Sequence, residues 1–283
     1  MVATGAVRDE VYLHLTAGRE TERFYLLAAN AKIQLLARAS IVKTVPGSAP
    51  APKAPAQKPA TTAAAAKAPG AASKPGTKPP TVAAPISDQP VAEPPAPIMQ
   101  DWWLVRDDQG HAGWILAGRL DVDVPDEIGT YAEGQHYVGV YVLNKVYDAE
   151  ATTPDHQVPQ YLTVLAPPKG GLPFDFDQVR VYTWSVKRHR YETAFRLHPI
   201  KGYLPVRQLP PTSNGAPVFS FQIANGDNLT TDAETGVTRP AFPRTITYMM
   251  IDTQVRRTGP DMGPIPVGHL EGDKAKAAKK KGK

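Results

Sequence analysis

Apolar and polar residues alternate over many short stretches of the chain, a pattern typical of β-strands with one buried face. In the C-terminal half these stretches are separated by turns rich in proline and glycine. Such spacing predicts an all-β, sandwich-like domain over residues 135–258. Its predicted strands are 136–143, 160–165, 179–186, 191–197, 202–206, 218–223 and 245–251. Residues 225–243 lack the pattern and are predicted to form a long polar loop.

The segment 102–120 carries the clearest strand signal and predicts a β-hairpin. Trp103 would point to one side of its first strand and Trp102 to the other, because successive side chains of an extended chain alternate. Asp108-Gln109-Gly110 supplies turn residues, and Gly110 can take the positive φ that tight hairpins need. The chain then returns through Gly113-Trp114-Ile115, where we expect Trp114 to be a core residue.

Three further apolar stretches, 11–15, 24–27 and 31–36, precede a sharp change in composition. Residues 44–98 consist mainly of Ala, Pro, Lys, Thr and Gly, so they are predicted to be a disordered insertion with polyproline II character. Residues 1–43 are too few to build a core alone. We therefore expect 6–43 and 99–122 to form one small barrel that the insertion interrupts. The alternative is an ordinary linker that follows a separate N-terminal fragment.

The Trp-initiated strand, the turn at Gly110 and the run Gly113-Trp114-Ile115 resemble the bacterial SH3-like (SH3b) domain. This resemblance implies a small barrel with a binding or scaffolding role in the cell envelope or periplasm. It implies peptidoglycan peptides or a protein partner as the ligand, held in an aromatic groove. The candidate groove residues are Trp102, Trp103, Tyr12 and Tyr25.

Residues 123–134 are predicted to form a short connecting helix. Pro125 suits a first helical turn, Asp126 and Glu127 would lie near the positive end of the helix dipole, and Gly134 would follow the last turn. The final residues, 259–283, are predicted to be a disordered basic tail.

The net charge of +5 and the pI of about 9.2 come mostly from lysines in the insertion and the tail. A nucleic-acid-binding protein concentrates its charge on a folded face, so nucleic acid is not expected as a partner. No apolar run approaches the roughly 20 residues of a transmembrane segment. The N-terminus lacks the cationic and apolar regions of a signal peptide. We therefore expect either a truncated start or a cytoplasmic protein, and the sequence leaves the oligomeric state open.

Several classes of chemistry are absent from the sequence. There is no cysteine, which excludes a disulfide framework, a thiolate metal site and a cysteine nucleophile. The seven histidines show no zinc-peptidase spacing, and no Gly-x-Ser-x-Gly elbow or phosphate-binding loop is present. We expect no catalytic residue, no cofactor and no metal. Asp175 and Asp177, with Asp155 upstream, are predicted to lie in a solvated turn rather than a calcium loop.

The densest charged cluster in the predicted β domain contains Arg188, His189, Arg190, Glu192 and Arg196. In a hairpin Arg190, Glu192, Ala194 and Arg196 would share one face, so Glu192 would lie between two guanidiniums. Three interpretations follow: a site for an anion or a partner, an acid–base pair of His189 and Glu192, or a solvated face. In a solvated face each ion pair contributes at most about 1 kcal/mol.

These observations favour a non-catalytic binding or scaffolding protein of the bacterial cell envelope. Two alternatives remain at this point. One is an enzyme with an unrecognised site in the C-terminal β domain, and the other is a structural subunit of an envelope assembly. An enzyme predicts a concave site with convergent titratable groups, whereas a binding module predicts a shallow aromatic groove.

Overall fold

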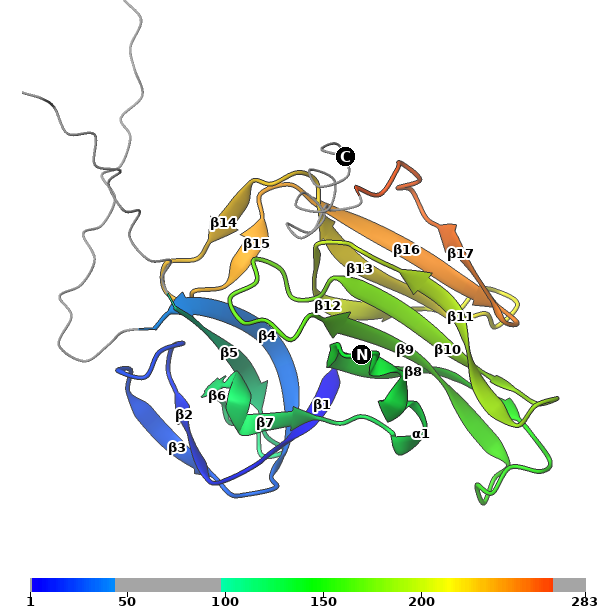
Figure 1. Cartoon of the computed structure of the whole chain (residues 1–283), viewed down its shortest axis with the longest axis horizontal. Coiled ribbons are helices and arrows are strands. Elements are labelled where there is room, and N and C mark those ends of the chain that lie inside the picture. The colour runs from blue at the N-terminus through cyan, green and yellow to red at the C-terminus, as the bar shows by residue number, and fades with distance from the viewer. Residues whose placement is uncertain (1, 44–97, 267–283) are drawn as a thin grey trace, which may run out of the picture. The chain divides into compact units, whose positions relative to one another are not determined.

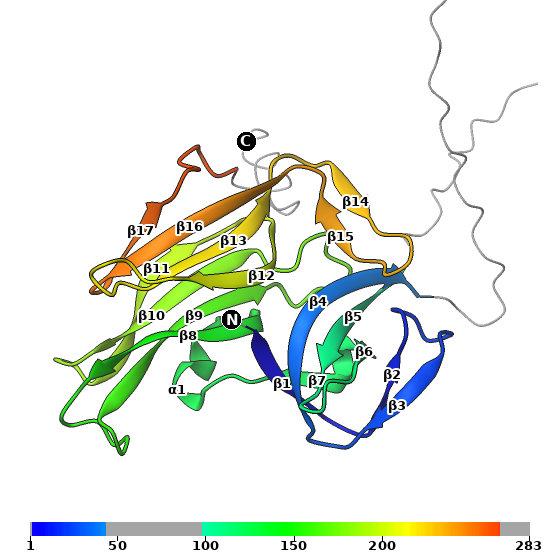
Figure 2. The same ribbon diagram turned by 180° about the vertical axis from the view of Figure 1, so that it is seen from behind.

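The computed structural model describes residues 2–43 and 98–266, and their regular secondary structure is almost entirely β-strand (Figures 1 and 2). The all-β fold predicted from the sequence is therefore confirmed. The strands are β1 (Ala3–Val7), β2 (Val11–His14), β3 (Arg23–Leu27), β4 (Lys32–Val42), β5 (Met99–Arg106), β6 (Ala112–Leu116), β7 (Leu120–Val122), β8 (His136–Tyr147), β9 (Gln157–Ala166), β10 (Gln178–Ser185), β11 (Arg190–Leu197), β12 (Gly202–Leu209), β13 (Val218–Ala224), β14 (Leu229–Thr231), β15 (Thr238–Pro240), β16 (Pro243–Ile251) and β17 (Gln254–Thr258). The short helices are η1 (Ala117–Arg119), α1 (Asp126–Gly129) and η2 (Thr130–Ala132).

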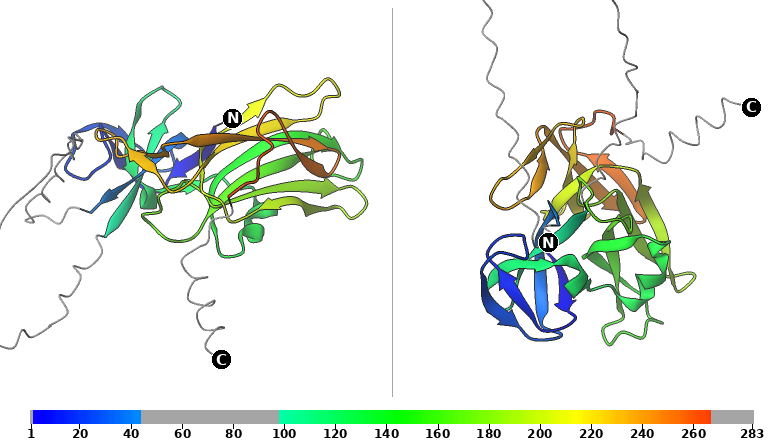
Figure 3. Two further views of the ribbon diagram at one scale, coloured as in Figure 1. Left: turned by 90° about the horizontal axis from the view of Figure 1, so that it is seen from above. Right: turned by 60° about the vertical axis from the view of Figure 1, so that its left-hand side comes forward.

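Seven strands from both sides of residues 44–97 form one curled sheet, in the order β3-β2-β6-β5-β4-β1-β7. In the right-hand view of Figure 3 these strands curl round as a partial barrel. β4 pairs with β5 from Leu35 and Val105 to Val42 and Met99. The interrupted sheet predicted from the sequence is thus confirmed, while the insertion predicted for 44–98 lies, except for Ile98, outside the described residues.

The two faces of β5 pack into different apolar clusters, as the alternation predicts. Trp103 and Val105 belong to the principal core, whereas Trp102 packs with Trp114 and Ala39 on the other side. Trp114 is 3% exposed, so its predicted place in a core is confirmed. β1 was not predicted as a strand, because its sequence Ala-Thr-Gly-Ala-Val has little of the β-branched and aromatic character that marks strands.

The remaining long strands form two antiparallel sheets of four strands, β11-β10-β9-β8 and β12-β13-β16-β17 (Figure 3). Their inner faces share one core, in which Leu162 of the first sheet joins Phe221 and Tyr248 of the second. The same core includes Leu13 and Trp103 of the curled sheet. The barrel and the β domain expected from the sequence therefore pack together within one compact unit of the described residues.

The connection between these parts contains the short helix that the sequence predicts. η2 follows α1 directly, and the two residues after η2, Glu133 and Gly134, both have positive φ. Ile128 of α1 is buried against Tyr161 and Tyr182, on the outer face of the sheet β11-β10-β9-β8.

The predicted polar loop 225–243 instead contains the hairpin β14–β15, so that part of the prediction is wrong. Its strands have three residues each, too few for an alternating pattern to stand out. The β14–β15 hairpin packs against the curled sheet. Val237 packs beside the Trp102 cluster, and a Cβ atom at Gly236 would lie 2.8 Å from the Ile41 side chain.

The prediction of a disordered tail is wrong for residues 259–266, because these residues pack against the fold. Arg244 donates through Nε and Nη2 to Asp261 at 2.8 and 2.6 Å, and Arg257 donates to the Gly263 carbonyl at 2.6 Å. Ile265 packs against the principal core. The remainder of the predicted tail lies outside the described residues.

A substitution at Gly113 of β6 tests the close packing of the curled sheet. A Cβ atom there would lie 2.8 Å from Leu13 Cβ and 3.0 Å from the Phe24 ring. We expect Gly113→Ala to lower the free energy of unfolding by about 1–3 kcal/mol through overpacking. Gly129 of α1 has nothing within 4 Å of its Cβ position. Gly129→Ala should be neutral or stabilising by up to about 1 kcal/mol. Equal effects of the two substitutions in urea unfolding would contradict this packing.

Candidate functional site

The curled sheet carries an open cleft of about 410 Å³, here called the curled-sheet cleft. It is lined by Glu10, Val11, Tyr12, His14, Arg19, Arg23, Leu26, Trp102, Leu116 and Arg119. β2 and β3 supply half of these residues, and β3 is an edge strand of the sheet. An edge strand leaves backbone groups unpaired, so an extended segment can lie alongside it.

Apolar and aromatic side chains form one wall of the curled-sheet cleft. Tyr12 and Leu26 lie directly opposite one another in the β2–β3 register and are 45% and 44% exposed. Trp102 is only 2% exposed, and its indole Nε1 has no hydrogen-bond partner among the described residues. A buried donor without a partner costs about 1–3 kcal/mol, so this N–H is suited to an acceptor that a ligand brings.

The charged side chains of the curled-sheet cleft are mainly basic. Arg119 is paired with Asp9 at 3.1 Å. Arg19 and Arg23 are exposed and make no ion pair within residues 2–43 and 98–266. Of the described residues, Glu10 is the one acidic residue in the lining. The cleft therefore favours a ligand that carries negative charge.

His14 adds a polar but uncharged group to this cleft. Its ring lies edge-on to Trp102, with centroids 5.2 Å apart, and its Nδ1 is 3.1 Å from Thr21 Oγ1. Burial and the nearby charge of Arg23 lower the pKa of His14 below its usual value. His14 is thus neutral at pH 7, and the positive charge comes from the arginines.

The four aromatic residues proposed from the sequence do not form one groove. Tyr12 and Trp102 line the curled-sheet cleft, whereas Trp103 lines another cleft on the opposite side of β5. Tyr25 stacks on His111 with ring centroids 3.8 Å apart. The prediction failed because Trp102 and Trp103 are consecutive strand residues, and consecutive side chains cannot face the same ligand. Arg19 and Arg23 were missed because they carry no sequence signal beyond a polar loop.

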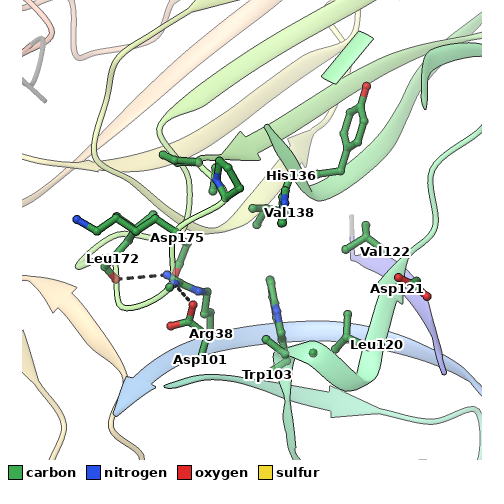
Figure 4. Close-up of a pocket in the computed structure, with 18 of the residues that line it drawn as sticks. Arg38, Asp101, Trp103, Leu120, Asp121, Val122, His136, Val138, Leu172 and Asp175 are labelled. Atoms are coloured by element: carbon green, nitrogen blue, oxygen red, sulfur yellow. Dashed lines mark hydrogen bonds and ion pairs between the residues drawn. The ribbon is translucent and has the colours of Figure 1, made fainter. Parts of the chain in front are cut away.

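A second cleft, the inter-sheet cleft, lies between the curled sheet and β8–β9 and has a volume of about 560 Å³ (Figure 4). Trp103, Leu120 and Val138 supply apolar walls, and Arg38 lies beside Asp101. Arg38 Nη2 is 2.8 Å from Asp101 Oδ2. Arg38 also donates to the carbonyls of Leu172 and Phe174 at 3.3 and 2.7 Å.

The polar groups of this arginine network satisfy one another. Asp101 also accepts hydrogen bonds from the Ser40 hydroxyl at 2.5 Å and from the Gly171 amide at 3.1 Å. Because the charges are already paired, the network is better suited to joining segments than to binding a charged ligand. It ties β4 and β5 to the loop that precedes β10.

Arg38→Met tests this role. The substitution removes a guanidinium that is almost fully buried and leaves the Asp101 carboxylate with uncompensated charge. We expect the free energy of unfolding to fall by about 3–5 kcal/mol. Arg8→Met is the matched control, because Arg8 lines the same cleft but pairs with Asp121 at an exposed position. Its loss should change stability by at most about 1 kcal/mol in urea unfolding.

The structure corrects the predicted solvated turn at Asp175 and Asp177, because both side chains are buried. Asp175 accepts a hydrogen bond from the Leu204 amide at 2.8 Å and lies 3.2 Å from Arg239, while burial raises its pKa. Asp177 lies 3.3 Å from His198, and burial raises its pKa as well. A tertiary contact causes the burial of both carboxylates. The turn is held against Gly202, whose missing side chain leaves room for the Phe176 ring.

Asp177 predicts a pH dependence of stability. A raised pKa means that the folded state holds the proton more tightly than the unfolded chain, so stability from this group is present at low pH and is lost as pH rises above 3.8. Asp177→Asn resembles the protonated form. We expect its stability relative to the native protein to be higher at pH 8 than at pH 4. Glu234→Gln, at an exposed position, is the control. A stability difference that is the same at both pH values would contradict the assignment.

The charged cluster on β11 is arranged differently from the prediction. Glu192 pairs with Arg188 at 2.7 Å and lies 3.6 Å from Arg190, but Arg196 pairs instead with Glu133 at 3.3 Å. A register shift between β10 and β11 causes the difference. The extra residue, Ala194, puts Glu192 and Arg196 on opposite faces of the sheet. The prediction that Arg190, Glu192 and Arg196 share one face is therefore wrong.

His189 and Glu192 do not form the expected acid–base pair. His189 Nδ1 is 2.9 Å from Asp148 Oδ2, and its Nε2 is 3.2 Å from Glu150 Oε2. Asp148 also accepts a hydrogen bond from Trp184 Nε1 at 2.7 Å. These contacts hold the β10–β11 turn against the end of β8.

Comparison with family models, curated proteins and solved structures finds no match to this chain. Within the described residues, no three His, Asp or Glu side chains are placed to hold a metal ion. No helix in the described ranges has the length and apolar character to cross a membrane. Function is therefore inferred from the shape and the lining side chains of the clefts.

Proposed function

We propose that this protein is a non-catalytic binding protein and that its curled-sheet cleft holds an extended, acidic peptide segment. The observation that carries the proposal is the unpaired indole N–H of Trp102 beneath the exposed pair Tyr12 and Leu26. Arg19 and Arg23 stand beside this wall without an acidic partner among the described residues.

Each group has a separate role in the proposed complex. Arg19 and Arg23 attract negative charge over several ångströms, an effect that salt screens. Trp102 Nε1 donates to a carbonyl or carboxylate oxygen of the ligand. Tyr12 and Leu26 cover apolar parts of the segment, whose backbone runs along the edge strand β3.

The resemblance of the 102–115 region to SH3b modules supports a place in the bacterial cell envelope. In that setting the ligand is a peptidoglycan peptide or an acidic segment of a protein partner. The two ligand sources share the same chemistry in the cleft, and binding experiments distinguish them.

The test measures binding to purified peptidoglycan by co-sedimentation and to a fluorescein-labelled peptide of alternating Glu and Leu by anisotropy. Arg19→Gln combined with Arg23→Gln should weaken binding about tenfold or more at low salt, a loss of about 1.4 kcal/mol. The loss should shrink at high salt. Arg207→Gln removes another exposed, unpaired arginine, on β12, and should leave binding unchanged.

Trp102→Phe separates binding from folding. It removes the indole N–H but retains an aromatic ring, so binding should fall. The cavity left by the smaller ring lowers the free energy of unfolding, and removal of the unpaired donor offsets part of that loss. Binding to the peptide alone would identify the ligand as a protein segment. If neither probe binds, or if all variants bind like the native protein, the proposed function is wrong.

A further inference from the structure

A third cleft lies at one end of the two facing β-sheets and is here called the sandwich-end cleft. Its volume is about 620 Å³, within the range of small-molecule sites. Both sheets and the turn between β12 and β13 contribute to it. The lining residues are Asn144, Val146, Gln160, Thr212, Asn214, Gly215, Ala216, Pro217, Met249, Met250, Ile251 and Asp252.

Two carboxamides replace the apolar core at this end of the sheets. Val164 and Leu162 of β9 are fully buried in the principal core. Gln160 is the next residue on the same face of the strand and is 2% exposed. Asn144 of β8 lies directly opposite Gln160 in the register, so the two side chains share that face.

The oxygen atoms of both carboxamides are left unpaired by the part of the chain that the structure describes. Asn144 Oδ1 and Gln160 Oε1 are buried and have no hydrogen-bond partner among the described residues. Each unpaired buried acceptor costs about 1–3 kcal/mol, and an apolar residue in the same row would avoid that cost. A cleft lined by two such groups is therefore suited to a ligand that supplies the missing hydrogen bonds.

The lining also limits the charge of that ligand. Among residues 2–43 and 98–266, no Arg, Lys or His lines the sandwich-end cleft, and Asp252 is its one ionisable group. An anion would gain no ion pair there and would be repelled by Asp252. The ligand of the sandwich-end cleft thus differs from the acidic segment proposed for the curled-sheet cleft.

We propose that the sandwich-end cleft binds a neutral saccharide. A carboxamide offers an acceptor oxygen and two N–H donors, and a sugar hydroxyl can both donate and accept. Neighbouring hydroxyls match the cross-strand pair Asn144 and Gln160, and Asp252 adds a further acceptor. Val146, Pro217 and Met249 supply apolar surface for the C–H groups of the sugar ring.

The experiment titrates the whole protein with maltotriose, with chitotriose and with the neutral peptide trialanine amide. The side-chain amide resonances of Asn144 and Gln160 are followed by ¹⁵N–¹H NMR. We expect at least one saccharide to shift both resonances in a saturable way and the peptide to leave them in place. No saturable shift with either saccharide at tens of millimolar, or a shift with the peptide alone, overturns the proposal.

Matched variants distinguish a binding role from a structural one. Gln160→Leu should abolish saccharide binding while leaving the free energy of unfolding unchanged or higher, because an unpaired polar group is removed. Gln222→Leu is the control, since Gln222 lies on the outer face of β13, opposite Thr245. Unchanged saccharide binding by Gln160→Leu would contradict the site. The Arg19→Gln/Arg23→Gln variant should retain saccharide binding, so this proposal and the proposed peptide function can fail separately.

Discussion

The pairing of β4 with β5 is the interaction on which the rest of the structure depends. It joins strands from both sides of residues 44–97 into one seven-stranded sheet. A connection of roughly 50 residues instead of about 5 raises the entropic cost of closing the loop by only about 2 kcal/mol. A register from Leu35–Val105 to Val42–Met99, with buried side chains on both faces of β5, outweighs that cost. Without this pairing neither flank would have a partner for its apolar surface.

The buried polar groups that line the inter-sheet cleft are paired, whereas some of those that line the other two clefts are not paired within the described residues. Arg38 and Asp101 are partly or fully buried, and each is surrounded by partners that satisfy its charge. Trp102 Nε1 and the carbonyl oxygen of Gln160 are equally buried, yet they lie at cleft walls without a partner in the described part of the chain. Asp177 and Arg257 also have buried atoms without a hydrogen-bond partner in the described residues, but neither residue lines any of the three clefts. The positions of Trp102 Nε1 and Gln160 Oε1 at cleft walls therefore point to ligands. They also indicate two ligands of different charge.

A single β-bulge illustrates how sensitive a surface site is to register. One extra residue on β11 moves Arg196 away from Glu192 and toward Glu133. The charged cluster that looks continuous in the sequence is therefore divided between two faces of a sheet. Its carboxylates are shared among neighbouring arginines, which fits a solvated face better than a site for an anion.

Alternation of apolar residues was sufficient to determine the all-β class, most of the long strands, the opposite faces of Trp102 and Trp103, and the burial of Trp114. These properties follow from local geometry, because side chains of extended chain alternate whatever the tertiary structure is. The order of the seven strands, the hairpin β14–β15 and the shared core depend on contacts between residues far apart in sequence. The same holds for the burial of Asp175 and Asp177, since acids in a turn look solvated until Gly202 and Phe176 are brought together. The clefts also depend on contacts between residues far apart in sequence. Nothing local distinguishes Arg19, Arg23 or Gln160 from other polar residues, and only the packed sheets show which of their hydrogen bonds and ion pairs are left unmade.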